Sequence, residues 1–216
     1  MLLFIFFACS RAPIEDRWEH GGLTQLKDAF TSSFILNTSE GWVLIDTGFN
    51  KNAKPLHRFL EENDASFSDI ETIIVTHGHG DHIGAHGNFP DATFYVHEDD
   101  KNLLEEESVT NITTFVEGEV FTFGDSTIRP LEAPGHTQGN VALIVDDVLV
   151  MGDTAQVTKD GRLETVSPRY AEDSEEAEAS LIELQNKIEP YRDNISWIAC
   201  SHSGPIKGTD ALYEVE

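Results

Sequence analysis

The chain of 216 residues contains only two cysteines, Cys9 and Cys200, which lie near opposite ends of the sequence. Two distant cysteines cannot form a disulfide-rich scaffold. No apolar stretch approaches the roughly 20 residues that a helix needs to cross a bilayer, so no membrane-spanning segment is predicted. Linkers rich in glycine and serine are also missing, as are sequence repeats. These absences favour one globular domain.

Basic residues are scarce, because 14 Lys and Arg stand against 39 Asp and Glu, for a net charge of −25. A surface with this charge repels phosphate backbones and anionic lipid headgroups, so it argues against nucleic acid as a partner. Hydrophobic residues make up 39% of the chain and aromatic residues 9%, which excludes wholesale disorder. The length is sufficient to bury a substantial core.

The N-terminal stretch MLLFIFFA is wholly apolar and continues into Cys9 and Ser10. This order resembles the end of a bacterial lipoprotein signal, in which the cysteine is lipidated and becomes the mature N-terminus. The resemblance implies a bacterial source and a periplasmic or membrane-tethered enzyme with a lipid anchor at Cys9. A small N-terminal strand of a cytoplasmic enzyme explains the same residues equally well. We therefore separate residues 1–16 from a single predicted domain over residues 17–216.

Short apolar strands alternate with polar helical stretches from Thr31 onward. The spacing of apolar residues predicts amphipathic helices over 51–63 and 171–190, and an acidic helix over 98–107. Apolar runs bounded by turn residues predict strands at 34–36, 42–45, 72–76, 92–97, 119–123, 127–132, 140–145, 148–151 and 195–200. Helices placed between sheet-forming strands indicate an α/β layered fold.

Three histidines and an aspartate fall within residues 77–82, directly after the predicted strand 72–76. Imidazole and carboxylate groups are the ligands that suit zinc, iron and similar ions. Glycines at positions 78 and 80 would let the backbone turn tightly and direct these side chains inward. Three more candidate ligands follow later strands, namely His136, Asp153 and His202. Their shared placement predicts one metal site at one edge of the sheet.

The order of these motifs resembles the metallo-β-lactamase superfamily. The matching motifs are DTG at 46–48, HxHxDH at 77–82, PGHT at 134–137, GD at 152–153 and SHSGP at 201–205. The resemblance covers about residues 31–208. It implies an α/β fold of the four-layered αβ/βα sandwich type with mixed sheets. The metals would lie in a groove at the sheet edge.

The resemblance also implies a ligand set for a binuclear site. The first metal would be bound by His77, His79 and His136, and the second by Asp81, His82 and His202, with Asp153 bridging both. The implied cofactors are two Zn²⁺ per chain, with iron or manganese as alternatives. A hydroxide between the metals would attack an electrophilic carbonyl or phosphorus atom, with Asp81 and Asp153 as the catalytic residues.

Residues outside this set have expected roles as well. In the superfamily Asp46 would brace the histidine loop through hydrogen bonds. His86 is expected to be structural or to lie at the rim of the groove, and His97 is expected at the surface near that rim. Cys200 is expected to be a buried thiol. The groove walls should come from loops 49–54 and 156–170 and from the N-terminal segment.

The activities of superfamily members are distinguished by the residues of their sites and not by their shared fold. Class B β-lactamases lack the bridging aspartate, so Asp153 argues against β-lactam hydrolysis. Hydroxyacylglutathione hydrolases share all seven ligands but add a basic C-terminal helical region, and only about fourteen residues follow His202 here. Acyl-homoserine lactonases match the ligand set, although the nearest tyrosine after the aspartate is Tyr170.

We therefore predict a metal-dependent hydrolase of a small ester, thiolester or lactone. One alternative is a phosphodiesterase or small nuclease with the same site, because residues 82–90 resemble the metallo-β-lactamase domain-containing 1 proteins, for which nuclease activity has been proposed. Another is a mononuclear-iron oxidoreductase acting on sulfur substrates. The only partner predicted is the small-molecule substrate, and the sequence does not indicate an oligomeric state.

Overall fold

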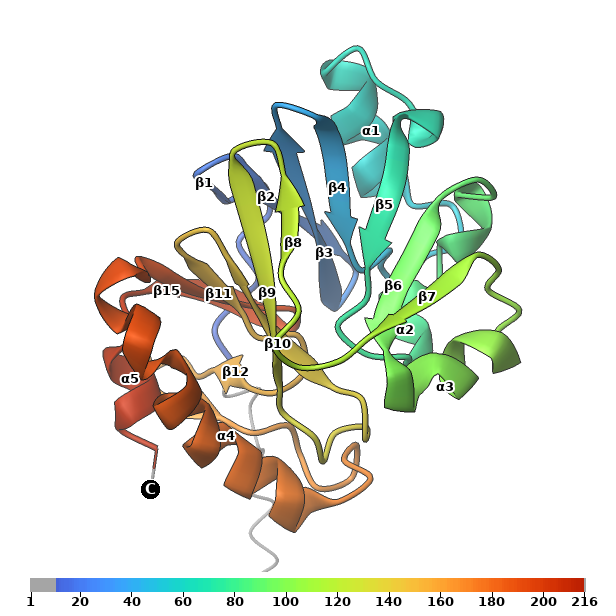
Figure 1. The fold of residues 1–216 in the computed structure, drawn as a ribbon. Coiled ribbons are helices and arrows are strands. Elements are labelled where there is room, and N and C mark those ends of the chain that lie inside the picture. The colour runs from blue at the N-terminus through green and yellow to red at the C-terminus, as the bar shows by residue number, and fades with distance from the viewer. Residues whose placement is uncertain (1–10, 216) are drawn as a thin grey trace, which may run out of the picture.

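The protein consists of two β-sheets that pack face to face, with helices on the outer side of each (Figure 1). This description rests on a computed structural model and covers residues 11–215. The order of layers is helix, sheet, sheet, helix, which confirms the predicted α/β sandwich. The lipoprotein signal or N-terminal strand expected at 1–16 falls mostly on residues 1–10, and these lie outside the described residues.

Within residues 11–215 the first sheet has seven strands in sequence order, antiparallel from β1 to β4 and parallel from β4 to β7. Its strands are β1 (Glu19–His20), β2 (Leu23–Asp28), β3 (Thr31–Thr38), β4 (Gly41–Ile45), β5 (Ile70–Ile74), β6 (Thr93–His97) and β7 (Ile112–Phe115).

Over the same residues the second sheet has six strands in the order β15-β14-β11-β10-β9-β8, and only β11 and β14 pair in parallel. Its strands are β8 (Phe121–Phe123), β9 (Ser126–Glu132), β10 (Val141–Val145), β11 (Val148–Val150), β14 (Trp197–Cys200) and β15 (Ser203–Lys207). A separate ribbon pairs β12 (Gln156–Val157) with β13 (Leu163–Glu164).

The three predicted helices form as α1, α3 and α4 but begin later than expected, whereas the short helices α2 and α5 were not predicted. The α-helices are α1 (Lys54–Glu62), α2 (Gly80–Ile83), α3 (Lys101–Glu106), α4 (Ser174–Ile188) and α5 (Asp210–Tyr213), and the 3₁₀ turns are η1 (Phe67–Asp69), η2 (His86–Asn88), η3 (Glu98–Asp100) and η4 (Glu189–Asn194). Helix α4 begins after Asp173, whose carboxylate accepts hydrogen bonds from Glu175 N and Glu176 N. Pro190 lies in the first turn of η4, where its missing N–H costs no hydrogen bond.

The central core lies between the two sheets because alternate residues of each strand face inward. Phe34 and Leu36 of β3 belong to this core together with Leu143 of β10. Ile35, between the two β3 residues, packs instead with the apolar face of α1. Ile144 of β10 packs in the same way against the layer that contains α4. Both faces of these strands are therefore buried, which explains their continuous apolar runs.

Six strands of the described residues were not predicted, namely β1, β2, β7, β12, β13 and β15. Strands β1, β12 and β13 have two residues each, which is too short for an alternating pattern to show. Each of the other three has a local reason. Strand β2 contains the polar Gln25, which is buried because its amide donates to Cys200 O and Ser32 Oγ, both at 2.9 Å. Strand β7 is the edge strand of its sheet and exposes two threonines. Strand β15 begins inside the SHSGP motif.

In the part of the chain from 11 to 215, no helix combines the length and apolarity needed to cross a membrane.

The strands that precede the candidate site residues end at one edge of the sandwich. Strands β4 and β5 are parallel neighbours in the first sheet, and β11 and β14 are parallel neighbours in the second. The sheets are joined at this edge, where Val141 N donates to Thr76 O at 3.0 Å. The loops after these strands therefore meet in one place, as predicted for a single site.

Candidate metal centre

The histidine cluster forms a tight turn between β5 and the short helix α2. His77 follows the strand, His79 is the N-cap residue of α2, and His82 lies within the helix. His82 N donates to His79 O at 2.9 Å, which closes the turn. The side chains of His77 and His82 are fully buried, with ring centroids 4.0 Å apart. The close spacing in sequence thus becomes a close spacing of imidazole nitrogens.

His136 joins His77 and His79 to form the first group of candidate ligands. His136 Nε2 lies 2.9 Å from His79 Nδ1 and 3.1 Å from His77 Nε2. Tetrahedral zinc with Zn–N bonds of about 2.0–2.1 Å places its ligand nitrogens about 3.3 Å apart. The three nitrogens are therefore gathered at close to the spacing that a shared divalent ion requires.

His202 joins Asp81 and His82 to form the second group. Asp81 Oδ2 lies 3.3 Å from His202 Nε2 and 3.8 Å from His82 Nε2. His202 follows β14, whereas the other two residues belong to α2, so this group joins the two sheets.

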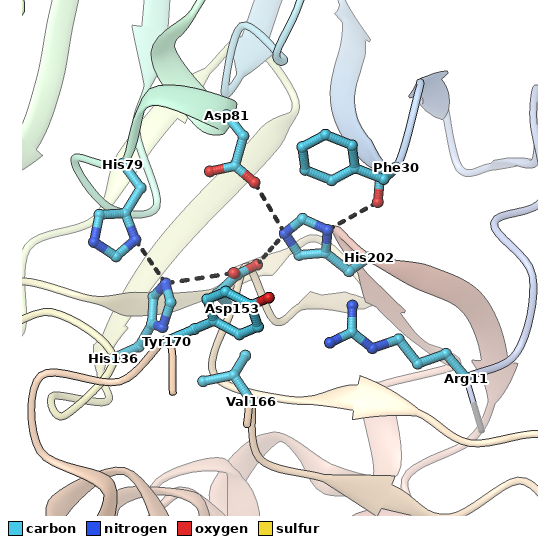
Figure 2. Close-up of a pocket in the computed structure, with 9 residues that line it drawn as sticks. All are labelled: Arg11, Phe30, His79, Asp81, His136, Asp153, Val166, Tyr170 and His202. Carbon is cyan, nitrogen blue, oxygen red and sulfur yellow. Dashed lines mark hydrogen bonds and ion pairs between the residues drawn. The ribbon is translucent and has the colours of Figure 1, made fainter. Parts of the chain in front are cut away.

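Asp153 lies between the two groups, three residues after the end of β11. Its Oδ1 is 3.3 Å from His82 Nε2 and 3.1 Å from His202 Nε2. Its Oδ2 is 3.4 Å from His136 Nε2, on the other side (Figure 2). The structure thus brings all seven predicted site residues together, with Asp153 between the others.

Hydrogen bonds on the outer side of the rings determine which nitrogen faces the site. His202 Nδ1 donates to Phe30 O at 2.8 Å, and His82 Nδ1 lies 2.7 Å from Asp46 Oδ2. The Thr76 hydroxyl donates to Asp46 Oδ2, so its oxygen accepts from His77 Nδ1 at 3.2 Å. These contacts favour the tautomers whose Nε2 lone pairs point into the site.

Asp46 is buried at the end of β4 and has the bracing position that the sequence predicted. Besides His82 and the Thr76 hydroxyl, it accepts a hydrogen bond from Thr76 N at 2.8 Å. The next residue, Thr47, donates its backbone N–H to His82 O at 2.6 Å. The DTG motif therefore holds both ends of the histidine turn.

Asp100 is a second bracing residue, and sequence analysis missed it by treating it as part of an acidic helix. Its buried carboxylate accepts hydrogen bonds from Gly78 N at 2.8 Å and from Thr137 Oγ1 and Gly139 N at 2.7 Å. One carboxylate thus joins the turn that holds His77 to the loop that holds His136. The sequence signal was weak, because many other acidic residues surround this one.

The donor set fits a divalent cation. His82 Nε2 and Asp153 Oδ1 are buried and have no hydrogen-bond partner among the described residues. Buried polar atoms are normally paired, so two such atoms facing one another indicate a missing electrophile. Imidazole nitrogens and carboxylate oxygens are also the ligands that zinc and similar ions prefer.

The shifts in pKa divide these side chains into those that become harder to protonate and those held in their charged form. Burial lowers the pKa of His77 well below its ordinary value and lowers that of His136 to about 4, so both imidazoles are neutral at pH 7. Burial also acts on His202, but the Asp153 and Asp81 carboxylates outweigh it and raise its pKa to about 9. Burial opposes ionisation of Asp153, yet the His82 and His202 side chains that face it hold its pKa well below the usual range.

A cavity of about 550 Å³ opens over this cluster (Figure 2). Besides the site residues His79, Asp81, His136, Asp153 and His202, its walls are formed by Arg11, Phe30, Val166 and Tyr170. Loop 156–170 and the N-terminal segment therefore contribute to the walls as predicted, whereas loop 49–54 supplies none of the residues that line the cavity. Phe30 was missed because it lies in the turn between β2 and β3, far from every motif.

The other residues named in the sequence analysis lie outside the two groups of candidate ligands. His86 Nδ1 donates to Ile83 O at 2.9 Å. The prediction that His97 lies at the surface was wrong, because it is buried and its Nε2 contacts Glu132 Oε1 at 2.9 Å, which joins the two sheets. Cys200 is a buried thiol as expected, and burial raises its pKa to about 12.

Comparison with known proteins places these features in a family. The sequence model of the metallo-β-lactamase superfamily matches residues 26–189. A probable metallo-hydrolase of Methanocaldococcus jannaschii is 30% identical over 153 residues, covering 71% of this chain and 68% of that protein. A hydroxyacylglutathione hydrolase of Prochlorococcus marinus is 31% identical over 51% of this chain, but the match spans only 46% of that protein.

Among solved structures, a metallo-β-lactamase from Pontibacter korlensis has a similar fold. The TM-score is 0.72 at 19% identity, and the match covers 93% of this chain and 95% of that one. The family match covers most of the chain, and the similarity to a named metallo-hydrolase extends over two thirds of both sequences. The chain therefore belongs to the metallo-β-lactamase superfamily and is a hydrolase of that superfamily.

Proposed function

We propose that the protein is a binuclear zinc hydrolase that cleaves a small ester, thiolester or lactone. The residues that would hold the metals are His77, His79 and His136 for the first ion and Asp81, His82 and His202 for the second, with Asp153 shared by both. The observation that supports this most directly is the position of Asp153, whose two carboxylate oxygens face different histidine groups.

When bound, the two cations would supply Lewis acidity and lower the pKa of a coordinated water. The chain's own residues would prepare the site for them. The outer hydrogen bonds of His82 and His202 hold the rings so that each Nε2 faces inward. Preorganised ligands of this kind need no rearrangement when charge develops on the substrate.

Asp81 is placed to handle a proton. Its Oδ2 contacts His202 Nε2, while Figure 2 shows its other oxygen turned toward the side of the cavity that His79 lines. We assign that oxygen as the acceptor of a proton from the attacking water, which is general-base catalysis. The proton would then pass to the departing alcohol or thiol.

The choice of an acyl substrate rests on the cavity and on the relatives. A cavity of about 550 Å³ suits a small molecule, and part of its wall is apolar. A hydroxyacylglutathione hydrolase, which is named for cleaving a thiolester, is among the relatives. The net charge of −25 disfavours a polyanionic substrate such as RNA.

Metal analysis combined with a substrate panel tests this proposal. We expect about two zinc ions per chain and about one or fewer in Asp153→Asn, because the shared ligand is lost. Hydrolysis of the best thiolester, ester or lactone should fall at least about 100-fold in the same variant. Asp91→Asn is the matched control, because Asp91 is exposed and remote from the site.

Two results would contradict the proposal. One is an Asp153→Asn protein that retains two metal ions and normal turnover. The other is a wild-type enzyme that cleaves bis(p-nitrophenyl) phosphate with a higher kcat/KM than every acyl substrate tested. The second result would point to the phosphodiesterase alternative.

A further inference from the structure

The N-terminal segment brings an arginine to the cavity wall. Ala12 N donates to Val157 O at 2.8 Å, and Arg11 forms an isolated antiparallel bridge with Thr158. These contacts anchor the backbone of the segment to the ribbon strand β12. The Arg11 side chain is half-buried and lines the same cavity as Asp153 and His202. Figure 2 shows its guanidinium group turned inward, below the His202 ring.

This guanidinium has no ion-pair partner in the part of the chain from 11 to 215. The arginines found in ion pairs there are Arg17, Arg162 and Arg192. Arg129 is also half-buried and in no ion pair, but its guanidinium lies over the Tyr191 ring. Among residues 11–215 the Arg11 guanidinium has neither a carboxylate nor an aromatic ring as a partner. Arg11 is also the only lysine or arginine among the residues described as lining the cavity.

The rest of the cavity wall offers an apolar surface beside this charge. The Phe30 ring stacks on His202, with ring centroids 5.8 Å apart and planes 8° from parallel. Phe30 and Tyr170 remain 53% and 59% exposed, which is high for large aromatic side chains at one opening. The cavity thus combines the reacting site, an apolar wall and one unpaired cation.

We propose that Arg11 binds a carboxylate on the substrate, at the end away from the bond that is cleaved. This inference rests on the proposed acyl hydrolase activity and names its substrate class. The substrate would be a small ester, thiolester or lactone with an apolar body and a terminal carboxylate. The planar fork of N–H groups on a guanidinium matches the two oxygens of a carboxylate.

A pair of matched esters tests the charge preference. The p-nitrophenyl monoester of adipic acid and p-nitrophenyl hexanoate have acyl chains of the same length, and only the first ends in a carboxylate. We expect wild-type kcat/KM to favour the adipate ester by about 10- to 100-fold, the range for a hydrogen-bonded charge pair. In Arg11→Gln this ratio should fall toward one, mainly through KM, and Arg11→Lys should restore part of it.

Arg17→Gln is the matched control, because Arg17 pairs with Glu62 outside the cavity. This variant should keep the wild-type ratio. A ratio near one in the wild-type enzyme, or an unchanged ratio in Arg11→Gln, overturns the proposal.

Binding of uncleaved analogues separates this proposal from the proposed activity. Calorimetry of the zinc-loaded protein with adipamate and hexanamide, which have an amide in place of the ester, needs no turnover. We expect adipamate to bind at least about tenfold more weakly to Arg11→Gln than to wild type. Equal adipamate affinity in the two proteins refutes the role of Arg11, whereas failure to cleave any ester refutes only the acyl hydrolase activity.

Discussion

Replacing Asp100 with asparagine should loosen the connection between the two loops that hold the first histidine group. The Asp100 Oδ2 atom accepts hydrogen bonds from Gly78 N and Thr137 Oγ1, and Oδ1 accepts one from Gly139 N. An asparagine keeps the Oδ2 bonds best if its amide oxygen takes that position. Its NH₂ group then faces the Gly139 N–H, so two donors oppose each other and neither is paired.

The cost follows from the lost bond and the unpaired donor. A hydrogen bond to a charged group contributes about 1.5–3 kcal/mol, and a buried unpaired donor costs about 1–3 kcal/mol. Because these two terms overlap, we expect the free energy of unfolding to fall by about 2–4 kcal/mol. For a chain of this size the corresponding loss in Tm is about 5–15 °C. Zinc affinity should fall about tenfold, because His136 is no longer held against His77.

Thermal and urea unfolding of the variant, with zinc content measured by elemental analysis, provide the assay. Asp99→Asn is the matched control, because its side chain is 59% exposed in the same segment and should change stability by less than about 0.5 kcal/mol. If Asp100→Asn also stays within about 0.5 kcal/mol and keeps its zinc, the bracing role of Asp100 is refuted.

Three further predictions concern the loops and the metal ligands. A Cβ at Gly135 would lie 2.2 Å from Ala177 N in α4, whereas Gly41 has almost the same φ, 117° against 118°, with open space around it. Gly41→Ala should therefore lower the free energy of unfolding by about 1–3 kcal/mol, because alanine is strained at this φ. Gly135→Ala should lower it by about 1–3 kcal/mol more, because its Cβ also clashes with α4. Urea unfolding measures both losses, and equal losses would contradict the clash. His79→Ala should abolish hydrolysis, whereas His202→Ala should keep one metal ion and residual activity. His57→Ala is the control, because His57 is exposed. Equal, mild losses in the first two variants would contradict the assignment of His79 to the first metal and His202 to the second. Zinc added at pH 7 should release at least one proton per chain, because the pKa of His202 is raised to about 9 and metal ligands must be deprotonated. A pH indicator measures the release. Zinc binding without proton release would contradict this prediction.

The sequence alone was sufficient to predict the longer helices, most of the strands and the location of the candidate site. The apolar spacing that predicted α1 and α4 reflects local geometry, since residues three and four apart share one face of a helix. The histidine turn is also local, because six consecutive residues carry four of the candidate ligands. His136, Asp153 and His202 each follow a strand, and this placement predicted that they meet at one edge of the sheet. Their role as metal ligands stays a prediction.

Only the tertiary structure decided which distant side chains surround that site. Phe30 and His202 are 172 residues apart in sequence, yet a hydrogen bond joins them. Asp100 and Gln25 were unremarkable polar residues until packing buried them among backbone donors and acceptors. Arg11 lines the cavity only because its segment is anchored to β12. Contacts of this kind depend on strand register and on the packing of layers, and no local pattern of residues encodes them.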